Sequence, residues 1–117
     1  MSNWTHIYAI VKIEQIFSFS KELITDFREN VINLLENAPN ITGSEGNASV
    51  DIIKFTKTVW NYDKQDNENN VNCVYLAIIG DLRDREINQT TKEYNDFINY
   101  FSCDEEFSVE VLTIDIN

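Results

Sequence analysis

The chain has 117 residues, of which 43% are hydrophobic, with only three glycines and one proline. This length fits one domain, residues 1–117, and the composition supports a packed core and excludes a disordered or linker-rich chain. The net charge is −11, and the second half is the more acidic, with 13 acidic against four basic residues in 61–117. Such a charge repels phosphates, so direct nucleic-acid binding is not expected, and it favours a basic protein partner.

The first half of the chain predicts a strand, a helix and a second strand. Residues 7–13 alternate between apolar and other side chains, which is the period of a strand with one buried face. Apolar residues then recur at helical spacing between Leu23 and Leu35, after an N-cap at Ser18 or Ser20. Pro39 marks the helix end, because the residue before a proline avoids the helical region. The β-branched and aromatic segment that follows predicts a second strand at residues 50–62.

The second half predicts a hairpin, a helix and a last strand. The polar segment 63–70 is expected to connect the second strand to a nearly continuous apolar strand at residues 71–79, which Gly80 would end. Thr90 and Glu93 match the capping box of a second helix. Its apolar stripe would be Tyr94, Phe97, Ile98 and Phe101, and residues 107–116 predict the last strand.

The resulting β-α-β-β-α-β order predicts an α+β fold of the ferredoxin-like type. Such a fold has an antiparallel four-stranded sheet with both helices on one face. The other face of the sheet would then be open, and it would carry Tyr8, Ile10 and one set of side chains from residues 71–79. An open apolar face often meets another subunit, so the sequence is compatible with a homodimer.

This topology brings three segments together at one end of the sheet: the start of the first strand, the loop after the first helix, and the segment after the third strand. The chemically distinctive residues there are Trp4, His6, Thr42, Ser44, Glu45, Asp81, Arg83 and Arg85. An aromatic surface, backbone amides in a glycine turn and guanidinium groups are what a nucleotide or phosphate ligand needs. The alternative is structural, with glycines that build a turn and arginines that pair with nearby carboxylates.

The opposite end is expected to be acidic. The connections between the second and third strands, and between the second helix and the last strand, both map there. Their acidic residues are Asp63, Asp66, Glu68, Asp104, Glu105 and Glu106. Such a patch could mimic a nucleic-acid backbone and dock on a basic channel. A solvated acidic rim explains the same residues equally well.

Catalytic, metal and cofactor sites are not expected. The chain has one histidine and two cysteines, with no CxxC pair and no ligand spacing for a metal. Cys73 stands in an apolar run and is expected to be buried, whereas Cys103 is expected to be an exposed free thiol. We find no signal-peptide pattern and no apolar run of membrane-spanning length, which predicts a cytoplasmic protein without membrane contact.

Three short stretches carry a resemblance to known proteins: Trp4-Thr5-His6, Gly43-Ser44-Glu45-Gly46 and Gly80-Asp81-Leu82-Arg83-Asp84. Together they resemble small uncharacterised proteins of bacteriophages and mobile elements. Small acidic phage proteins of this size also resemble inhibitors of bacterial defence, including anti-CRISPR proteins. The resemblance implies a non-enzymatic protein that binds a host defence protein in the bacterial cytoplasm. Two alternatives stay open, a protein that sequesters a nucleotide signal and a structural or assembly subunit of a phage.

Overall fold

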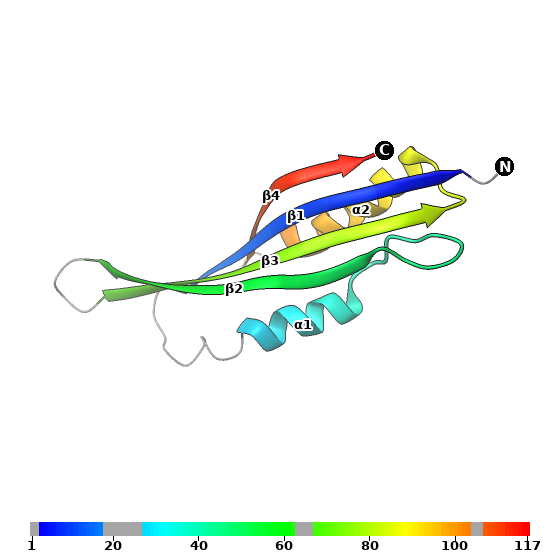
Figure 1. The fold of residues 1–117 in the computed structure, drawn as a ribbon. Coiled ribbons are helices and arrows are strands. Elements are labelled where there is room, and N and C mark those ends of the chain that lie inside the picture. Colours follow the sequence, from blue (N-terminus) through cyan, green and yellow to red (C-terminus); the bar gives the residue numbers. More distant parts are fainter. Residues whose placement is uncertain (1–2, 18–26, 63–66, 104–106) are drawn as a thin grey trace.

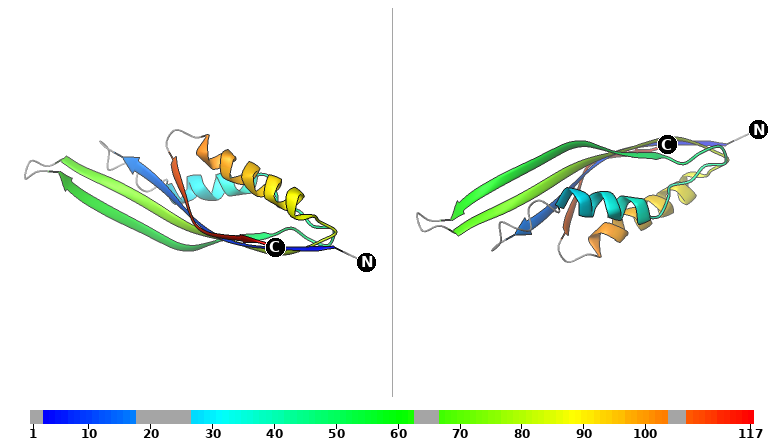
Figure 2. Two further views of the ribbon diagram at one scale, coloured as in Figure 1. Left: turned by 90° about the horizontal axis from the view of Figure 1, so that it is seen from above. Right: turned by 90° about the horizontal axis from the view of Figure 1, so that it is seen from below.

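The computed structural model describes residues 3–17, 27–62, 67–103 and 107–117. The four strands form one antiparallel sheet in the order β2-β3-β1-β4. Both helices lie on the same face of this sheet (Figures 1 and 2), so the predicted α+β, ferredoxin-like arrangement is confirmed. In chain order the elements are β1 (Trp4–Phe17), α1 (Phe27–Asn37), β2 (Ser49–Tyr62), β3 (Asn67–Arg83), α2 (Ile87–Ser102) and β4 (Phe107–Ile116).

The molecule is elongated, with principal extents of 65 × 23 × 22 Å. The sheet sets this length, because a strand of 17 residues such as β3 spans about 56 Å. The helices are much shorter, with 11 residues in α1 and 16 in α2, or about 16 and 24 Å. Figure 1 shows that the β2–β3 hairpin therefore extends beyond both helices, away from the two chain termini.

The core lies between the sheet and the helices. Alternate residues of β1 point into it, and Ile7, Ala9, Val11 and Ile13 are at most 2% exposed. The predicted apolar stripe of α2 covers them, with Tyr94, Phe97 and Phe101 buried and Ile98 partly buried. Phe97 and Phe101 pack edge to face, with ring centroids 5.1 Å apart. Of the first predicted helix, Ser18, Ser20 and Leu23 lie outside the described residues.

The third strand was predicted too short. Gly80 does not end it, because β3 continues through Gly80 to Arg83 and pairs with β1 as far as Trp4. The glycine is required for another reason. A Cβ built on Gly80 would lie 2.8 Å from the Cβ of Ala48 and 2.9 Å from its Cα. Gly80 therefore marks a close backbone approach at the start of β2 rather than a strand end.

The capping box predicted at Thr90 and Glu93 is also wrong. Helix α2 begins at Ile87, with Glu86 as its N-cap, and the reciprocal capping contacts join Glu86 and Gln89. Thr90 is one turn inside the helix and fully buried. The same spacing of a polar residue and a glutamine or glutamate occurs twice in a row, and the copy nearer the start of the chain forms the cap.

Each edge strand contains one extra residue relative to its neighbour. The register between β2 and β3 shifts at Ile53, and that between β4 and β1 shifts at Leu112. Both side chains are exposed, at 56% and 47%. These β-bulges bend the two outer strands of the sheet.

The two cysteines lie as predicted, with Cys73 buried and Cys103 exposed, and both are free thiols. None of the helices in the described part of the chain is long and apolar enough to cross a membrane.

Candidate functional site

The three sequence-distant segments do meet at one end of the sheet, which we call the converging end: residues 3–6, 40–48 and 81–86. Backbone hydrogen bonds join them directly. The Ser44 amide donates to the Arg83 carbonyl at 3.0 Å, and the Asp84 amide donates to the Asn3 carbonyl at 2.6 Å. Asp84 adopts a left-handed conformation, with φ of 59°, that turns the chain from β3 toward α2. The converging end is thus a fixed junction of two loops and a strand.

The charged side chains nearest to β1 are paired across this junction. His6 Nδ1 lies 2.5 Å from the Asp81 carboxylate, and both side chains are more than half exposed. Arg83 forms an ion pair with Glu45 of the preceding loop. Trp4 is opposite Arg83 in the strand register and is 48% exposed. These five predicted site residues therefore lie together, and the cation among them contacts a carboxylate of the same chain.

A second set of contacts attaches the loop to α2. The backbone amide and the hydroxyl of Thr42 both donate to the Glu93 carboxylate, at 3.0 and 2.6 Å. Arg85 Nε and Nη2 each lie 3.4 Å from the Thr42 hydroxyl, and the Arg85 carbonyl accepts a hydrogen bond from Thr5 at 2.7 Å. Ser44 donates to the Asp84 carboxylate at 2.8 Å. Thr42, Ser44 and Arg85 are thus also brought together.

Sequence reasoning missed Glu93 and Thr5 as members of this network. Glu93 was assigned to the helix cap, although Thr90 and Phe97, which share its helix face, are both buried and could have indicated a carboxylate beside the core. Within the described ranges no group of three histidine, cysteine or acidic side chains could hold a metal ion. The network holds the loop on the sheet, and each of its polar groups already has a partner in the chain.

We expect Glu93→Gln to destabilise the protein by about 1.5–3 kcal/mol, because hydrogen bonds to a charged acceptor contribute that much. Glutamine keeps the size of the side chain but removes the charge that holds both donors of Thr42. Urea unfolding followed by circular dichroism measures the change. The matched control is Glu36→Gln, an exposed residue of α1, which should leave the midpoint unchanged. Equal midpoints for the two variants would contradict a role of Glu93 in stability.

The predicted acidic end is described only in part. Asp63, Asp66, Asp104, Glu105 and Glu106 lie outside the described residues. Glu68 is on β3, where it pairs with Asn61 of β2. Gln15 of β1 is the register partner of both Asn72 of β3 and Phe107, the first residue of β4. Asn72 is four residues after Glu68 along β3. Glu68 is therefore about 13 Å farther along the sheet than the start of β4.

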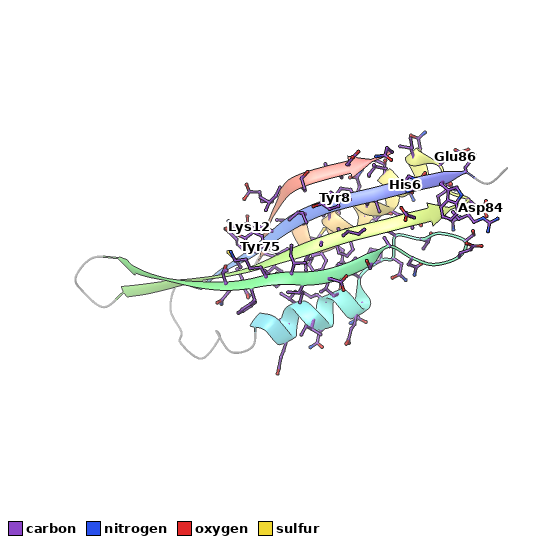
Figure 3. All side chains as sticks on the ribbon, viewed as in Figure 1. His6, Tyr8, Lys12, Tyr75, Asp84 and Glu86 are labelled. Carbon is purple, nitrogen blue, oxygen red and sulfur yellow. The ribbon has the colours of Figure 1, made fainter. Side chains whose placement is uncertain are left out.

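The open face of the sheet is apolar at its centre, as predicted. Tyr8 of β1 and Ile79 of β3 are register partners, and they are 48% and 50% exposed. The next pair, Ile10 and Ala77, continues the apolar patch. Lys12 and Tyr75 form the pair after that, and Figure 3 shows Tyr8, Lys12 and Tyr75 along these two central strands.

Charges flank this patch. Lys12 Nζ lies 2.5 Å from the Glu14 carboxylate, and the hydrogen bond from Lys12 lowers the pKa of Glu14. Lys54 of β2 lies 5.7 Å from the ring centroid of Tyr75. Glu14 also accepts a contact from Cys73 at 3.6 Å, and burial raises the pKa of that thiol. A thiol that is buried and harder to ionise is a weak nucleophile, so Cys73 is suited to packing.

A pocket of about 160 Å³ lies where α1 ends and β2 begins. The residues that line it are mostly apolar and include Leu35, Ile41, Val50 and Phe97, and they bring no charged side chain. Sites for small molecules usually have 300–1,000 Å³ and several convergent polar groups. This pocket has neither the size nor the chemistry of such a site.

No protein-family model and no curated protein matches the chain.

Proposed function

We propose that this chain is a non-enzymatic binding protein that acts by contact with a partner protein of basic surface. One observation carries the proposal: every lysine and arginine whose side chain the structure describes is engaged within the molecule. The contacts are Lys12 with Glu14, Lys54 with the Tyr75 ring, Arg83 with Glu45, Arg85 with Thr42, and Lys92 with Asp96.

Several carboxylates, in contrast, are exposed to solvent, and no basic side chain that the structure describes neutralises their charge. Glu29, Glu36, Asp51 and Glu110 are exposed, and none has an ion-pair partner in the part of the chain that the structure describes. The field outside the molecule is therefore negative, in keeping with the net charge of −11. Such a field attracts basic surfaces and accelerates their association.

The setting we propose is inhibition of a bacterial defence system by a phage-encoded protein. The support is the resemblance to small phage proteins, together with the sign of the surface charge. Defence proteins that hold nucleic acid have basic channels, and an acidic protein fits such a channel in place of a phosphate backbone. We propose Asp63, Asp66, Glu68, Asp104, Glu105 and Glu106 as the residues of contact.

The nucleotide-binding alternative has less support. Its two arginines, Arg83 and Arg85, already bind Glu45 and Thr42, so an anionic ligand would have to displace these partners. It would also approach a group of carboxylates that includes Asp81 and Asp84. No observation favours the structural-subunit alternative over a binding protein.

The test is a pull-down from bacterial lysate, followed by an affinity measurement with the captured partner. Neutralising the six proposed contact acids to their amides should weaken binding by about tenfold or more, because truncated interfacial charges act mainly on dissociation. The control neutralises Glu29 and Glu36, two exposed acids of α1 that lie away from the open face (Figure 1), and it should slow association while the complex persists. Unchanged affinity of the first variant would remove the reason for the proposal.

A further inference from the structure

We infer that the open face of the sheet binds a second copy of this chain, as a symmetric dimer with its two-fold axis parallel to the strands. The inference goes beyond the proposed function, because it concerns another surface and needs no other protein. It rests on the strand register, on the exposure of the apolar residues at the centre of the face, and on the charges around them.

The apolar centre of this face is placed where a two-fold axis could pass. Tyr8, Ile10, Ala77 and Ile79 lie on the two central strands, β1 and β3, and not at an edge of the sheet. Tyr8 and Ile79 each leave about half of their surface to solvent. Half-exposed aromatic and aliphatic side chains at the middle of a sheet are typical of an interface core.

A two-fold axis that runs between β1 and β3, parallel to both strands, determines which residues of the two copies face each other. Each residue of β1 then lies over its own register partner on β3 of the second copy. Tyr8 meets Ile79 of the second copy, and Ile10 meets Ala77 of the second copy, so apolar groups cover apolar groups. By the same rule His6 meets Asp81 of the second copy and Lys12 meets the Tyr75 ring of the second copy. The first pair is ionic when the imidazole is protonated, and the second is a cation–π contact.

The outer strands add a second pair of opposite charges. Lys54 of β2, Tyr75, Lys12 and Glu110 of β4 are register partners in a row across the sheet. The proposed axis exchanges β2 with β4, so Lys54 lies over Glu110 of the second copy, and the symmetry repeats this contact. Glu110 is exposed and has no ion pair among the described residues, while Lys54 contacts only a ring there. This row of the face is thus complementary to itself, although the whole chain is acidic. The remaining exposed carboxylates of the face, Asp51 and Asp115, lie over Thr113 and Ser49 of the second copy.

The other two-fold axis within this plane, perpendicular to the strands, is less favourable. It would exchange the two ends of the face, so that Tyr75 would lie over Asp81 and Lys12 over His6 of the second copy. Lys12 and His6 are both basic, so the second pair is not complementary, and Lys54 would no longer lie over Glu110. The charges therefore select the axis parallel to the strands.

The area is sufficient for a specific dimer. All four strands lie side by side from Tyr8 to Glu14, over about 19 × 20 Å, and β1 and β3 alone continue to Trp4, over about 10 × 13 Å. This gives roughly 500 Å² per copy, so two copies together bury about 1,000 Å², the lower limit for a biological interface. Remaining repulsion between the acidic surfaces is screened beyond about 8 Å at physiological ionic strength.

The test measures the mass of the purified full chain in solution by light scattering over a concentration series. We expect twice the 13.6 kDa of one chain, and the mass of one chain for Ile79→Glu with an unchanged urea midpoint. Lys54→Glu and Glu110→Lys should each weaken dimerisation by about tenfold, because each reversal affects both symmetry-related pairs. The double variant Lys54→Glu/Glu110→Lys should restore it, while Lys92→Glu, on α2, should have no effect.

Two results would overturn the inference: the mass of one chain at the highest concentration reached, or a double variant no tighter than its single parents. Both measurements use the purified chain alone. A failed pull-down would therefore contradict the proposed function and leave the dimer intact, and the reverse holds as well.

Discussion

Phe101→Ala should lower the free energy of unfolding by about 3–5 kcal/mol, the usual cost when a buried phenylalanine is truncated. Phe101 is 1% exposed, and it contacts the rings of Phe97 and Tyr100 at centroid distances of 5.1 and 5.2 Å. Helix α2 and the rigid sheet leave little freedom for the site to collapse around a smaller side chain. Because the free energy of unfolding of a small domain is only about 5–15 kcal/mol, this variant would be close to unfolding.

Urea unfolding followed by circular dichroism measures this loss. The matched control is Ile87→Ala on the same helix, where the side chain is 51% exposed, and its effect should stay within about 0.5 kcal/mol. A loss below about 1 kcal/mol for Phe101→Ala would show that α2 is not held to the sheet by this ring.

Gly80→Ala should destabilise the protein by about 1–3 kcal/mol, the range for overpacked sites. The new methyl group would lie within 3 Å of both Cα and Cβ of Ala48, and the backbone there would have to move. Thermal unfolding measures the effect. In the Gly80→Ala background, Ala48→Gly should recover part of the loss, because it removes the nearer of the two clashing atoms. Additive effects of the two substitutions would contradict this direct contact.

The fold could be predicted from the sequence because buried residues recur along the chain with the period of a strand or of a helix. The alternation from Ile7 to Ile13 marks the strand face that α2 covers, and Tyr94, Phe97 and Phe101 mark the helix face that covers it. Both patterns report which side of an element meets the core, and this property is local in sequence. The order of elements and the handedness of their connections then leave few topologies.

The two errors have a different origin. A glycine after an apolar strand is typical of a strand end, but the reason for Gly80 is Ala48, which is 32 positions earlier in the chain. Likewise, Thr90 and Glu93 have the spacing of a cap, yet Thr90 is buried and Glu93 binds Thr42 of a remote loop. A local sequence pattern does not indicate contacts between residues that are so far apart in the chain.

The candidate site was predictable to the same degree. Topology brought Trp4, the 40–48 loop and Arg83 to one end, because strand directions decide which loops share an end. It could not tell that Arg83 would bind Glu45, since the choice among several nearby carboxylates depends on side-chain geometry. That pairing agrees with the structural alternative, in which the arginines at this end pair with nearby carboxylates.

The extra residues Ile53 and Leu112 have a consequence for aggregation. A long antiparallel sheet with two free edges is a template for strands of other molecules, and continued growth along such edges leads toward amyloid-like assemblies. The bulges at Ile53 and Leu112 break the regular spacing of hydrogen-bonding groups on both outer strands. They lie within the paired part of each edge strand, where an incoming strand would need an unbroken ladder. The sheet is thereby protected against edge-to-edge polymerisation, and its exposed face is left as the surface through which copies can associate in a closed, finite form.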